Sequence, residues 1–536
     1  MISKEFLVGK GYLHIPVRSD NPETFYYIDV EVDGVVKNEF LIGIALPNEK
    51  HDFYVAMDLK RYNNEKVKLI CRDDVNECLF DGIIAGGPIE TEKLLYPDLY
   101  NEEIRQQIHF SPKRGWMNDP NGLFYNYGVF NMYFQHNPFA NHHYSTNVSW
   151  GLARSTDGVH FEEIKDVLMP RNSKLHIASG SALIDKNNIS GLGDDVILAA
   201  YTDLFTVQYH GRPEVTTGGC QNLLYSTDGG LNYTYLPNNP IINVPDYMTW
   251  RDPKILQVDD KTLVIAVYET YDNKNCVSFY KSTDCKTWDF CSRNMDLYEC
   301  PDLFKLKVSN SDEELWVLYG ASGKYQIGRF EDFCFKALTE DRYLDYGDSV
   351  YAGQTFNNYC DDKKRIYTAW LRDHDHDWQF HEKEPNRRFG FAQSMALFTE
   401  LTIFKENDQY HLFRKPLDSI KKLRMDECSL SINGETQISL PMELEFDITK
   451  DTKIYLGNHW FKYYENSHSI EVSTDKKYSF VNKDKVHVRM IFDTRSAEVY
   501  MNDEVVISFF VKPDKLLVES VESVFANKYL LESIWL

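Results

Sequence analysis

Short runs of apolar and β-branched residues alternate along the chain with clusters of turn-forming residues. Representative runs are Phe25–Val32, Val196–Tyr201, Leu263–Tyr268 and Leu315–Tyr319. Runs of this length bounded by Gly, Pro, Asn and Asp are typical of β-strands. Few windows show the apolar spacing of an amphipathic helix. We therefore predict an all-β protein.

A turn signature recurs three times in the middle of the chain. The tripeptide Ser-Thr-Asp follows a strand-like run each time and precedes an aromatic residue four or five positions after the Asp. The copies are Ser155–Asp157 with Phe161, Ser226–Asp228 with Tyr233, and Ser282–Asp284 with Trp288, and the segment around Asp332 and Phe335 resembles a degenerate fourth. Such side chains bond to their own backbone and stabilise tight turns. Repeats at this spacing are typical of propeller blades with insertions, and a common turn tripeptide is the alternative.

Changes in composition divide the chain into three predicted domains. Residues 1–103 are β-rich and end in the stretch LLYPDLYNEE. Residues 104–408 contain the repeats. Residues 409–536 begin with a Lys-rich stretch that we interpret as a linker, and then resume alternating strands such as Val486–Phe492. The alternation in this last part is typical of a β-sandwich.

Charge and cysteine spacing exclude several partners. The 536 residues carry a net charge of −23, which argues against nucleic acid or an anionic membrane as a partner. No stretch approaches the roughly 20 apolar residues of a membrane span, and the first residues lack a signal-peptide run. The ten cysteines show no metal-binding spacing. We expect reduced thiols in a cytoplasm and no metal site.

Three acidic strings combine aromatic, Pro and Gly residues, and they are WMNDPNG (Trp116–Gly122), WRDP (Trp250–Pro253) and YECPDLF (Tyr298–Phe304). Hydrolysis of a glycoside needs two carboxyl groups beside the scissile bond. In the first string, Pro120 and Gly122 favour a tight turn around Asp119, and a plain structural turn is the alternative.

The other two strings predict carboxyl groups with opposite electrostatics. Arg251 is expected to keep Asp252 ionised, with a structural ion pair as the alternative. Apolar neighbours are expected to raise the pKa of Glu299, as a general acid requires. Asp302, in the same string, competes with Glu299 for that role on composition alone.

The three strings, in this order, resemble those of glycoside hydrolase family 32, which contains invertases, inulinases and levanases. The resemblance begins at His109–Pro112 and extends to Phe492–Val499. It implies a five-bladed β-propeller followed by a β-sandwich. It also implies a retaining mechanism without a cofactor, in which Asp119 is the nucleophile, Glu299 the acid/base and Asp252 the transition-state stabiliser. The sugar-binding residues that it implies are Trp116, Asn118, Gln135, Trp150, Ser179, Arg251 and Trp370.

Some positions depart from the family pattern. Where relatives have Trp-Gly-Asn, this chain has Ser145-Thr146-Asn147, so that His142, His143 or Tyr144 is expected to supply the missing ring. The string Asp373–Asp377 alternates Asp and His, and we interpret it as a solvated acidic loop rather than a loose metal site. Residues 1–103 resemble, more weakly, the small β-domain that precedes the propeller in some bacterial-type levanases and inulinases.

The sequence therefore predicts an enzyme that releases terminal β-D-fructofuranosyl residues from sucrose or fructans through a fructosyl-enzyme on Asp119. A fructosyltransferase that uses the same residues is one alternative. A non-catalytic sugar-binding protein is another, and loss of one of the three acids would have favoured it. The predicted partner is a sugar, and the first and last domains leave a homodimer open.

Overall fold

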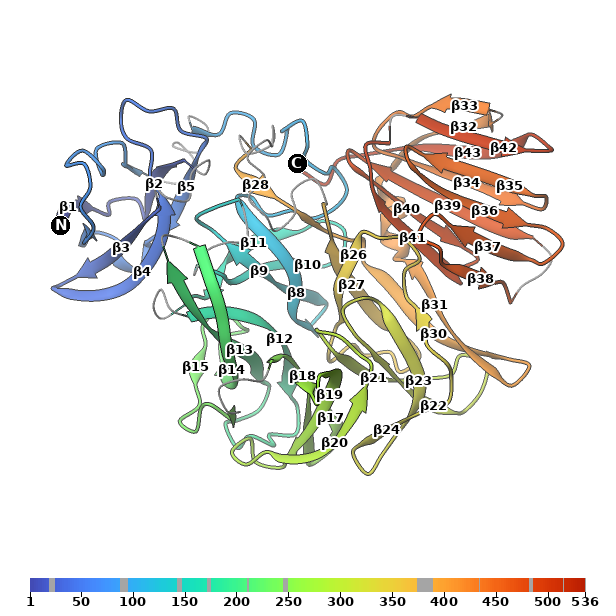
Figure 1. The fold of residues 1–536 in the computed structure, drawn as a ribbon, viewed down its shortest axis with the longest axis horizontal. Helices are drawn as coiled ribbons and strands as arrows, with labels where there is room; N and C mark the ends of the chain where they lie inside the picture. Colours follow the sequence, from blue (N-terminus) through green and yellow to red (C-terminus); the bar gives the residue numbers. More distant parts are fainter. Residues whose placement is uncertain are drawn as a thin grey trace.

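The computed structural model describes residues 1–18, 25–86, 95–141, 147–170, 175–209, 212–243, 249–373, 389–432, 434–481, 485–513 and 515–535. Strands dominate these ranges (Figure 1), and helix is limited to short segments such as η2 (Lys60–Tyr62) and η5 (Asp418–Leu423). The all-β prediction is confirmed. No helix in the described ranges is long and apolar enough to cross a membrane.

Two small sheets, here called the N-terminal sheets, form the first part of the chain (blue in Figure 1). One has the strand order β1-β6-β3-β4 and the other β5-β2-β7. Their strands are β1 (Ile2–Leu7), β2 (Tyr12–Val17), β3 (Phe25–Val32), β4 (Val35–Gly43), β5 (Phe53–Asp58), β6 (Lys66–Cys71) and β7 (Ile84–Gly86). Alternate residues of both sheets, such as Ile15, Val30 and Val55, are buried in one shared apolar core.

Five antiparallel sheets, sheet 1 to sheet 5, follow in chain order. Sheet 1 contains β8 (Gly115–Asn126), β9 (Val129–Asn137), β10 (Ser149–Ser155) and β11 (Glu162–Leu168). Sheet 2 contains β12 (Leu175–Asp185), β13 (Val196–Tyr209), β14 (Arg212–Ser226), β15 (Thr234–Tyr235) and β16 (Ile242–Asn243). Sheet 3 contains β17 (Trp250–Asp259), β18 (Thr262–Tyr271), β19 (Lys274–Ser282) and β20 (Asp289–Met295).

Sheet 4 contains β21 (Asp302–Lys307), β22 (Glu314–Tyr319), β23 (Lys324–Glu331), β24 (Cys334–Ala337) and β25 (Arg342–Tyr343). Sheet 5 contains β26 (Val350–Thr355), β27 (Arg365–Leu371), β29 (Ser394–Met395), β30 (Thr399–Glu406) and β31 (Gln409–Pro416). Because β31 pairs with β30 along its whole length, sheet 5 continues past the predicted boundary at residue 408, and the stretch interpreted as a linker begins with a strand.

The first strands of the five sheets contact one another in cyclic order, since β8 contacts β12, β12 contacts β17, β17 contacts β21, β21 contacts β26, and β26 contacts β8. A short strand near the end of this region, β28 (Phe391–Ala392), pairs in parallel with Gly115 and Trp116 of β8. Sheet 1 is thus completed by residues that lie far away in the sequence (Figure 1).

The Ser-Thr-Asp strings form the predicted turns. In the first copy, Ser155 Oγ accepts the Gly158 N–H at 2.8 Å, and Asp157 Oδ1 accepts the N–H groups of Val159 and His160. The second and third copies repeat this arrangement, and all three join the third strand of a sheet to the fourth. In sheet 4 the same place holds a two-residue turn, Asp332-Phe333, in which both residues have positive φ.

Two six-stranded sheets, here called the C-terminal sheets, complete the described chain (orange and red in Figure 1). One has the order β32-β43-β34-β39-β40-β41 and the other β33-β42-β35-β36-β37-β38. Their bounds are β32 (Arg424–Ile432), β33 (Gly434–Gln437), β34 (Met442–Ile448), β35 (Thr452–Leu456), β36 (His459–Tyr464), β37 (Ser469–Val472), β38 (Lys477–Ser479), β39 (Val486–Asp493), β40 (Ser496–Met501), β41 (Val505–Phe510), β42 (Lys515–Ser520) and β43 (Val524–Leu531). Apolar side chains from both, such as Leu444, Phe461 and Val488, share one core.

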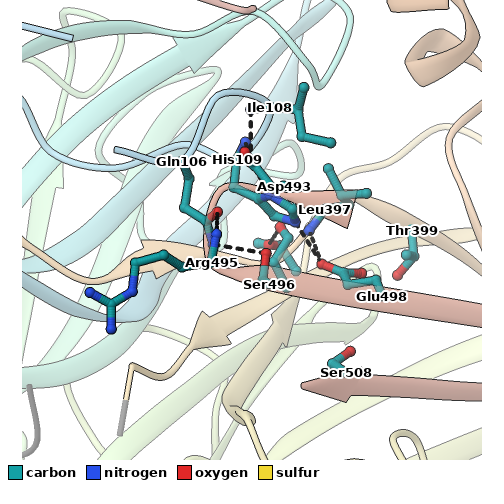
Figure 2. Close-up of polar contacts among 12 residues, drawn as sticks. Gln106, Ile108, His109, Leu397, Thr399, Asp493, Arg495, Ser496, Glu498 and Ser508 are labelled. Carbon is teal, nitrogen blue, oxygen red and sulfur yellow. Dashed lines mark hydrogen bonds and ion pairs between the residues drawn. The ribbon is translucent and has the colours of Figure 1, made fainter. Parts of the chain in front are cut away.

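A buried charge cluster joins the segment before β8 to the C-terminal sheets (Figure 2). His109 Nδ1 lies 2.7 Å from Asp493 Oδ2, at the end of β39, and His109 Nε2 lies 3.0 Å from Glu498 Oε1 on β40. All three side chains are fully buried. The two carboxylates also accept backbone N–H groups, which are those of Gln107, Ile108 and His109 on Asp493 and that of Leu397 on Glu498.

His109 carries a positive charge at neutral pH. Burial alone lowers the pKa of His109, but the hydrogen bonds and charges of Asp493 and Glu498 outweigh it and raise the pKa to about 9. A histidine whose pKa is raised on folding stabilises the fold fully below its unfolded pKa of roughly 6.5. This stabilisation is lost as the pH rises through the folded value.

We expect His109→Gln to lower the free energy of unfolding by about 3 kcal/mol or more at pH 6, because two buried carboxylates lose their cation. The difference from wild type should shrink as the pH rises through about 9, where the wild-type ring also loses its charge. Thermal unfolding between pH 6 and pH 10 measures both effects. His160→Gln is the control, because His160 pairs with Asp157 at an exposed turn and should have little effect. If the stability difference between wild type and His109→Gln did not change with pH, the result would contradict a positively charged His109.

Candidate active site

Four of the five sheets have a β-bulge near the beginning of the first strand. The register shifts lie between Met117 and Pro120 in β8, Ile177 and Gly180 in β12, Arg251 and Lys254 in β17, and Tyr351 and Gln354 in β26. A bulge takes residues out of the hydrogen-bonded ladder and redirects their side chains. The bulged residues include Asp119, Ser179 and Asp252. The bulges thereby bring polar residues from separate sheets to one end of the five sheets.

Sheet 4 reaches the same end without a bulge. Glu299 and Cys300 immediately precede β21, and both have a positive φ, of 49° and 39°. Left-handed backbone is unfavourable for residues other than glycine and is concentrated at functional sites. The Ala321 N–H bonds to the carbonyl groups of Tyr298 and Glu299, each at 2.9 Å, and holds this conformation.

Asp119 keeps some solvent exposure at the centre of the site. Its Oδ2 accepts the Ser179 hydroxyl at 2.6 Å and lies 3.6 Å from Cys300 Sγ. Loss of surrounding water raises the pKa of Asp119, and the charge of Glu299 adds to this. Hydrogen bonds from Ser179, Asn118 and Cys300 act in the opposite direction and limit the rise.

Asp252 is buried beside Asp119, with 6% of its surface exposed. Its Oδ2 accepts the Cys300 N–H at 3.1 Å and lies 3.6 Å from Cys300 Sγ. Burial raises the pKa of Asp252 to about 7; Arg251 lowers it, and the charges of Glu299 and Asp119 raise it further. Arg251 favours the ionised form of Asp252 as predicted, but burial outweighs a guanidinium whose Nε lies 3.6 Å away, so that the pKa of Asp252 is raised rather than lowered.

Glu299 has polar rather than apolar surroundings. Its carboxylate bonds to the Arg251 guanidinium through one oxygen and to the Tyr351 hydroxyl through the other. The side chain retains 18% exposure. The expectation of an apolar environment is thus wrong, since neighbours in sequence are not the groups that Glu299 contacts.

Asp302 lies apart from this group. It has no exposed surface, pairs with Lys254 at 3.0 Å, and accepts the backbone N–H and the hydroxyl of Thr355. A fully enclosed carboxylate with these partners has no path to a substrate. The geometry therefore favours Glu299 over Asp302 as the proton donor.

Aromatic rings form one side of the site. Trp116 and Trp370 pack edge to face with their centroids 6.1 Å apart, and Trp370 packs in the same way against Tyr351. The Trp116 indole donates to Asn118 Oδ1 at 3.0 Å, and the Trp370 indole donates to Gln393 Oε1 at 2.9 Å. These bonds fix the rings beside the carboxyl groups.

Gln135 and Trp150 lie further back. Both are almost completely buried, and they donate to the backbone carbonyls of Ile177 and Ala178, at 3.0 and 3.1 Å. In this structure they support the bulge that contains Ser179. Direct contact of either side chain with a sugar stays a prediction.

The structure adds two side chains to the site that the sequence analysis did not predict. The Cys300 thiol touches both Asp119 and Asp252, and burial together with these charges raises its pKa well above the ordinary value. Tyr351 contacts Glu299 from sheet 5. Cys300 lies within the YECPDLF string and could have been chosen there, whereas nothing in the sequence around Tyr351 indicates its role.

Two other predictions concern the loops. His142, His143 and Tyr144 lie outside the described residues, as do His374 to Asp377. Asp373 is described and is buried, with its backbone bonded on both sides to the Gln393 amide, so this first residue of the acidic string is not solvated. No group of acidic, His or Cys residues suited to a metal occurs in the described ranges.

An all-β chain that gathers three carboxyl groups from three of its sheets at one site is a suitable scaffold for a glycoside hydrolase. Residues 109–416, more than half of the chain, match the family model "Glycosyl hydrolases family 32 N-terminal domain". The chain therefore belongs to glycoside hydrolase family 32, which confirms the resemblance seen in the sequence.

Individual relatives agree with this assignment. An invertase of Wickerhamomyces anomalus is 32% identical over 365 residues, which cover 62% of this chain and 63% of the invertase. The chain thus spans less than two thirds of that relative. Two solved structures are similar in fold. They are an exo-inulinase of Aspergillus awamori (TM-score 0.68, 23% identity, 81% of this chain and 100% of the inulinase) and a fructofuranosidase of Schwanniomyces occidentalis complexed with fructose (TM-score 0.65, 24% identity, 80% and 99%).

We expect Asp252→Asn to be more stable than wild type at pH 8. A carboxyl group whose pKa is raised on folding stabilises the fold only when protonated, and this contribution is lost as the pH rises through about 7. At pH 8 the wild-type carboxyl group is ionised although it is buried, whereas the amide of the variant stays neutral. The melting temperature of the variant should therefore be higher than that of wild type by about 1 °C or more at pH 8, and should not be higher at pH 4. Asp260→Asn, at an exposed turn, should change neither value. A less stable Asp252→Asn at pH 8 would contradict the electrostatic description.

Proposed function

We propose that this chain is a retaining β-fructofuranosidase that releases terminal fructosyl groups from sucrose or fructans. The observation that carries the proposal is the arrangement of Asp119, Asp252 and Glu299 around Cys300. Asp119 and Asp252 both contact the Cys300 thiol, and Glu299 is the preceding residue. Retaining glycosidases need a nucleophilic carboxylate and an acid/base carboxyl group close together.

We propose that sheets 1 to 5 form a five-bladed β-propeller and that the C-terminal sheets form a β-sandwich. The cyclic contacts of the first strands and the pairing of β28 with β8 support the propeller. The shared apolar core of the two six-stranded sheets supports the sandwich. The N-terminal sheets are an addition to this arrangement.

In the proposed mechanism, Asp119 attacks the anomeric carbon of the fructosyl group while Glu299 gives its proton to the leaving oxygen. The bond to Asp119 forms as the glycosidic bond breaks, and the remaining sugar leaves as an alcohol. The Glu299 carboxylate, stabilised by Arg251, then takes a proton from water. That water attacks the same carbon and frees Asp119, so that two inversions give net retention.

The remaining polar groups are suited to bind and orient the sugar. Asp252 presents an acceptor for fructose hydroxyls, and Trp116 and Trp370 provide apolar ring surfaces. Ring faces pack well against the C–H surfaces of a sugar. The names of the relatives support the substrate class, since one is an invertase, one an exo-inulinase, and one a fructofuranosidase complexed with fructose.

The same residues would also serve a fructosyltransferase, in which a sugar hydroxyl replaces water in the second step. A non-catalytic sugar-binding protein is disfavoured because all three carboxyl groups are present and in contact with a common neighbour. We also propose a reducing compartment, which the scattered spacing of the ten cysteines in the sequence supports. A homodimer stays a prediction.

The proposal is tested by measuring glucose and fructose released from sucrose, inulin and levan at equal protein concentration. Equal amounts of both from sucrose, with little from the polymers, would identify an invertase. Rapid fructose from a polymer would identify an exo-fructanase. A large excess of glucose would indicate transfer, and no release from any of the three would contradict the proposed activity.

We expect Asp119→Asn to reduce turnover by about a thousandfold or more, because no fructosyl-enzyme can form without the carboxylate nucleophile. Asp228→Asn is the matched control, since Asp228 stabilises a turn of sheet 2 and an Asn can still accept the two backbone N–H groups that bond to Asp228 Oδ1. It should retain wild-type turnover. Proton NMR of the first product should show the β anomer of fructose. An inverted product, or substantial turnover by Asp119→Asn, would rule out this mechanism.

A further inference from the structure

The connection between β9 and β10 is anchored in the N-terminal sheets at both of its ends. Phe139, near its beginning, is buried in the core of the N-terminal sheets and stacks on Phe40 with the centroids 4.6 Å apart. Asn147, near its end, donates to the Leu41 carbonyl at 2.6 Å and accepts the Leu41 N–H at 2.9 Å. Only 3% of Asn147 is exposed.

The Asn147 amide takes the place of a neighbouring strand. Leu41 lies on β4, which is the last strand of its sheet in the order β1-β6-β3-β4. The outer N–H and C=O groups of an edge strand need partners, and here one side chain satisfies both groups of one residue. This buried contact fixes the position of Asn147, and with it that of the next residue, relative to the N-terminal sheets.

Residues at the two ends of this connection hold the bulged start of β12. The Val148 carbonyl accepts the Ile177 N–H at 3.2 Å, and Gln135 donates to the Ile177 carbonyl at 3.0 Å. Trp150 donates to the Ala178 carbonyl at 3.1 Å. In β12 the pairing with β13 is interrupted between Ile177 and Gly180, so that these contacts from sheet 1 replace the missing ladder bonds.

The next residue of the bulge is Ser179, whose hydroxyl donates to Asp119 at 2.6 Å. A continuous series of buried contacts therefore runs from Leu41 through Asn147, Val148 and Ile177 to this hydroxyl. We infer that the N-terminal sheets position the reactive carboxylate of the site, with Asn147 as the positioning residue that acts through the bulge of β12. The kinetic consequence rests on the proposed function.

The groups around Asp119 set its pKa, and they therefore determine how the pH dependence of kcat/KM would change if Ser179 were displaced. They are Ser179 from β12, Asn118 from its own strand, Glu299 and Cys300 from the segment before β21, and Asp252 on the far side of Cys300. The hydrogen bond from Ser179 lowers the pKa of Asp119. Weakening that bond should therefore move the acid limb of the kcat/KM profile to higher pH.

A double-mutant cycle tests the inference on the full chain. It compares Asn147→Ala, Ser179→Ala and the double variant with wild type. The control is Asn131→Ala, because Asn131 is a buried amide on the same sheet, bonded to Arg154 at 2.9 Å near the other end of β9. Removal of Asn131 costs side-chain hydrogen bonds without touching β12. If Asn147→Ala does not fold, Asn147→Ser takes its place.

We expect Asn147→Ala to lower kcat/KM by about threefold or more and to shift the acid limb in the same direction as Ser179→Ala. In the Ser179→Ala background, Asn147→Ala should have a smaller effect, because the series of contacts from Asn147 acts on Asp119 through the Ser179 hydroxyl. Fully additive effects would overturn the inference. So would an Asn147→Ala profile that matches that of Asn131→Ala.

Hydrogen exchange separates this inference from the proposed activity. Backbone amides of residues 175–181 should exchange faster in Asn147→Ala than in Asn131→Ala, whether or not the chain hydrolyses fructosides. A wild type inactive on all three sugars would overturn the proposed function, and the exchange rates alone would then decide the inference. Unchanged exchange in Asn147→Ala would overturn it.

Discussion

Mutual repulsion among carboxyl groups is the constraint around which the described structure is organised. Asp119, Asp252 and Glu299 meet in a poorly solvated space, where the charge of Glu299 raises the pKa of both aspartates and the charge of Asp119 raises the pKa of Asp252. No single strand can supply such a group, because alternate residues of a strand point to opposite faces. The bulges at the beginnings of the first strands turn Asp119 and Asp252 toward one point, and the left-handed segment before β21 brings Glu299 to it.

Buried polar contacts occur both at the three acidic strings and at a distance from them. Arg251 and Tyr351 bind Glu299 within the five sheets. At the border with the C-terminal sheets, the His109 imidazolium is enclosed by Asp493 and Glu498, and Glu498 also bonds to the backbone of Leu397. The C-terminal sheets thus share buried polar contacts with the segment that leads into β8 and with the connection between β29 and β30 of sheet 5.

The sequence predicted those features that are encoded locally. The strand runs, the Ser-Thr-Asp turns and the three acidic strings each lie within a few residues, and the structure confirms the strands and the turns. The partners of Glu299 and the pKa of Asp252 depend on groups from other sheets, and there local reasoning gave the wrong environment. The extension of sheet 5 beyond residue 408 was also hidden, because the Lys-rich stretch interpreted as a linker begins within β31.

The pairing of β28 with β8 has a consequence for the order in which the protein becomes complete. The strand that contains Asp119 lacks one neighbour until Phe391 and Ala392 have been synthesised. The partners of His109 on β39 and β40 are made later still. A chain that is still attached to the ribosome can form individual sheets, but it cannot assemble the finished site. The candidate site is therefore complete only after β40 has been synthesised.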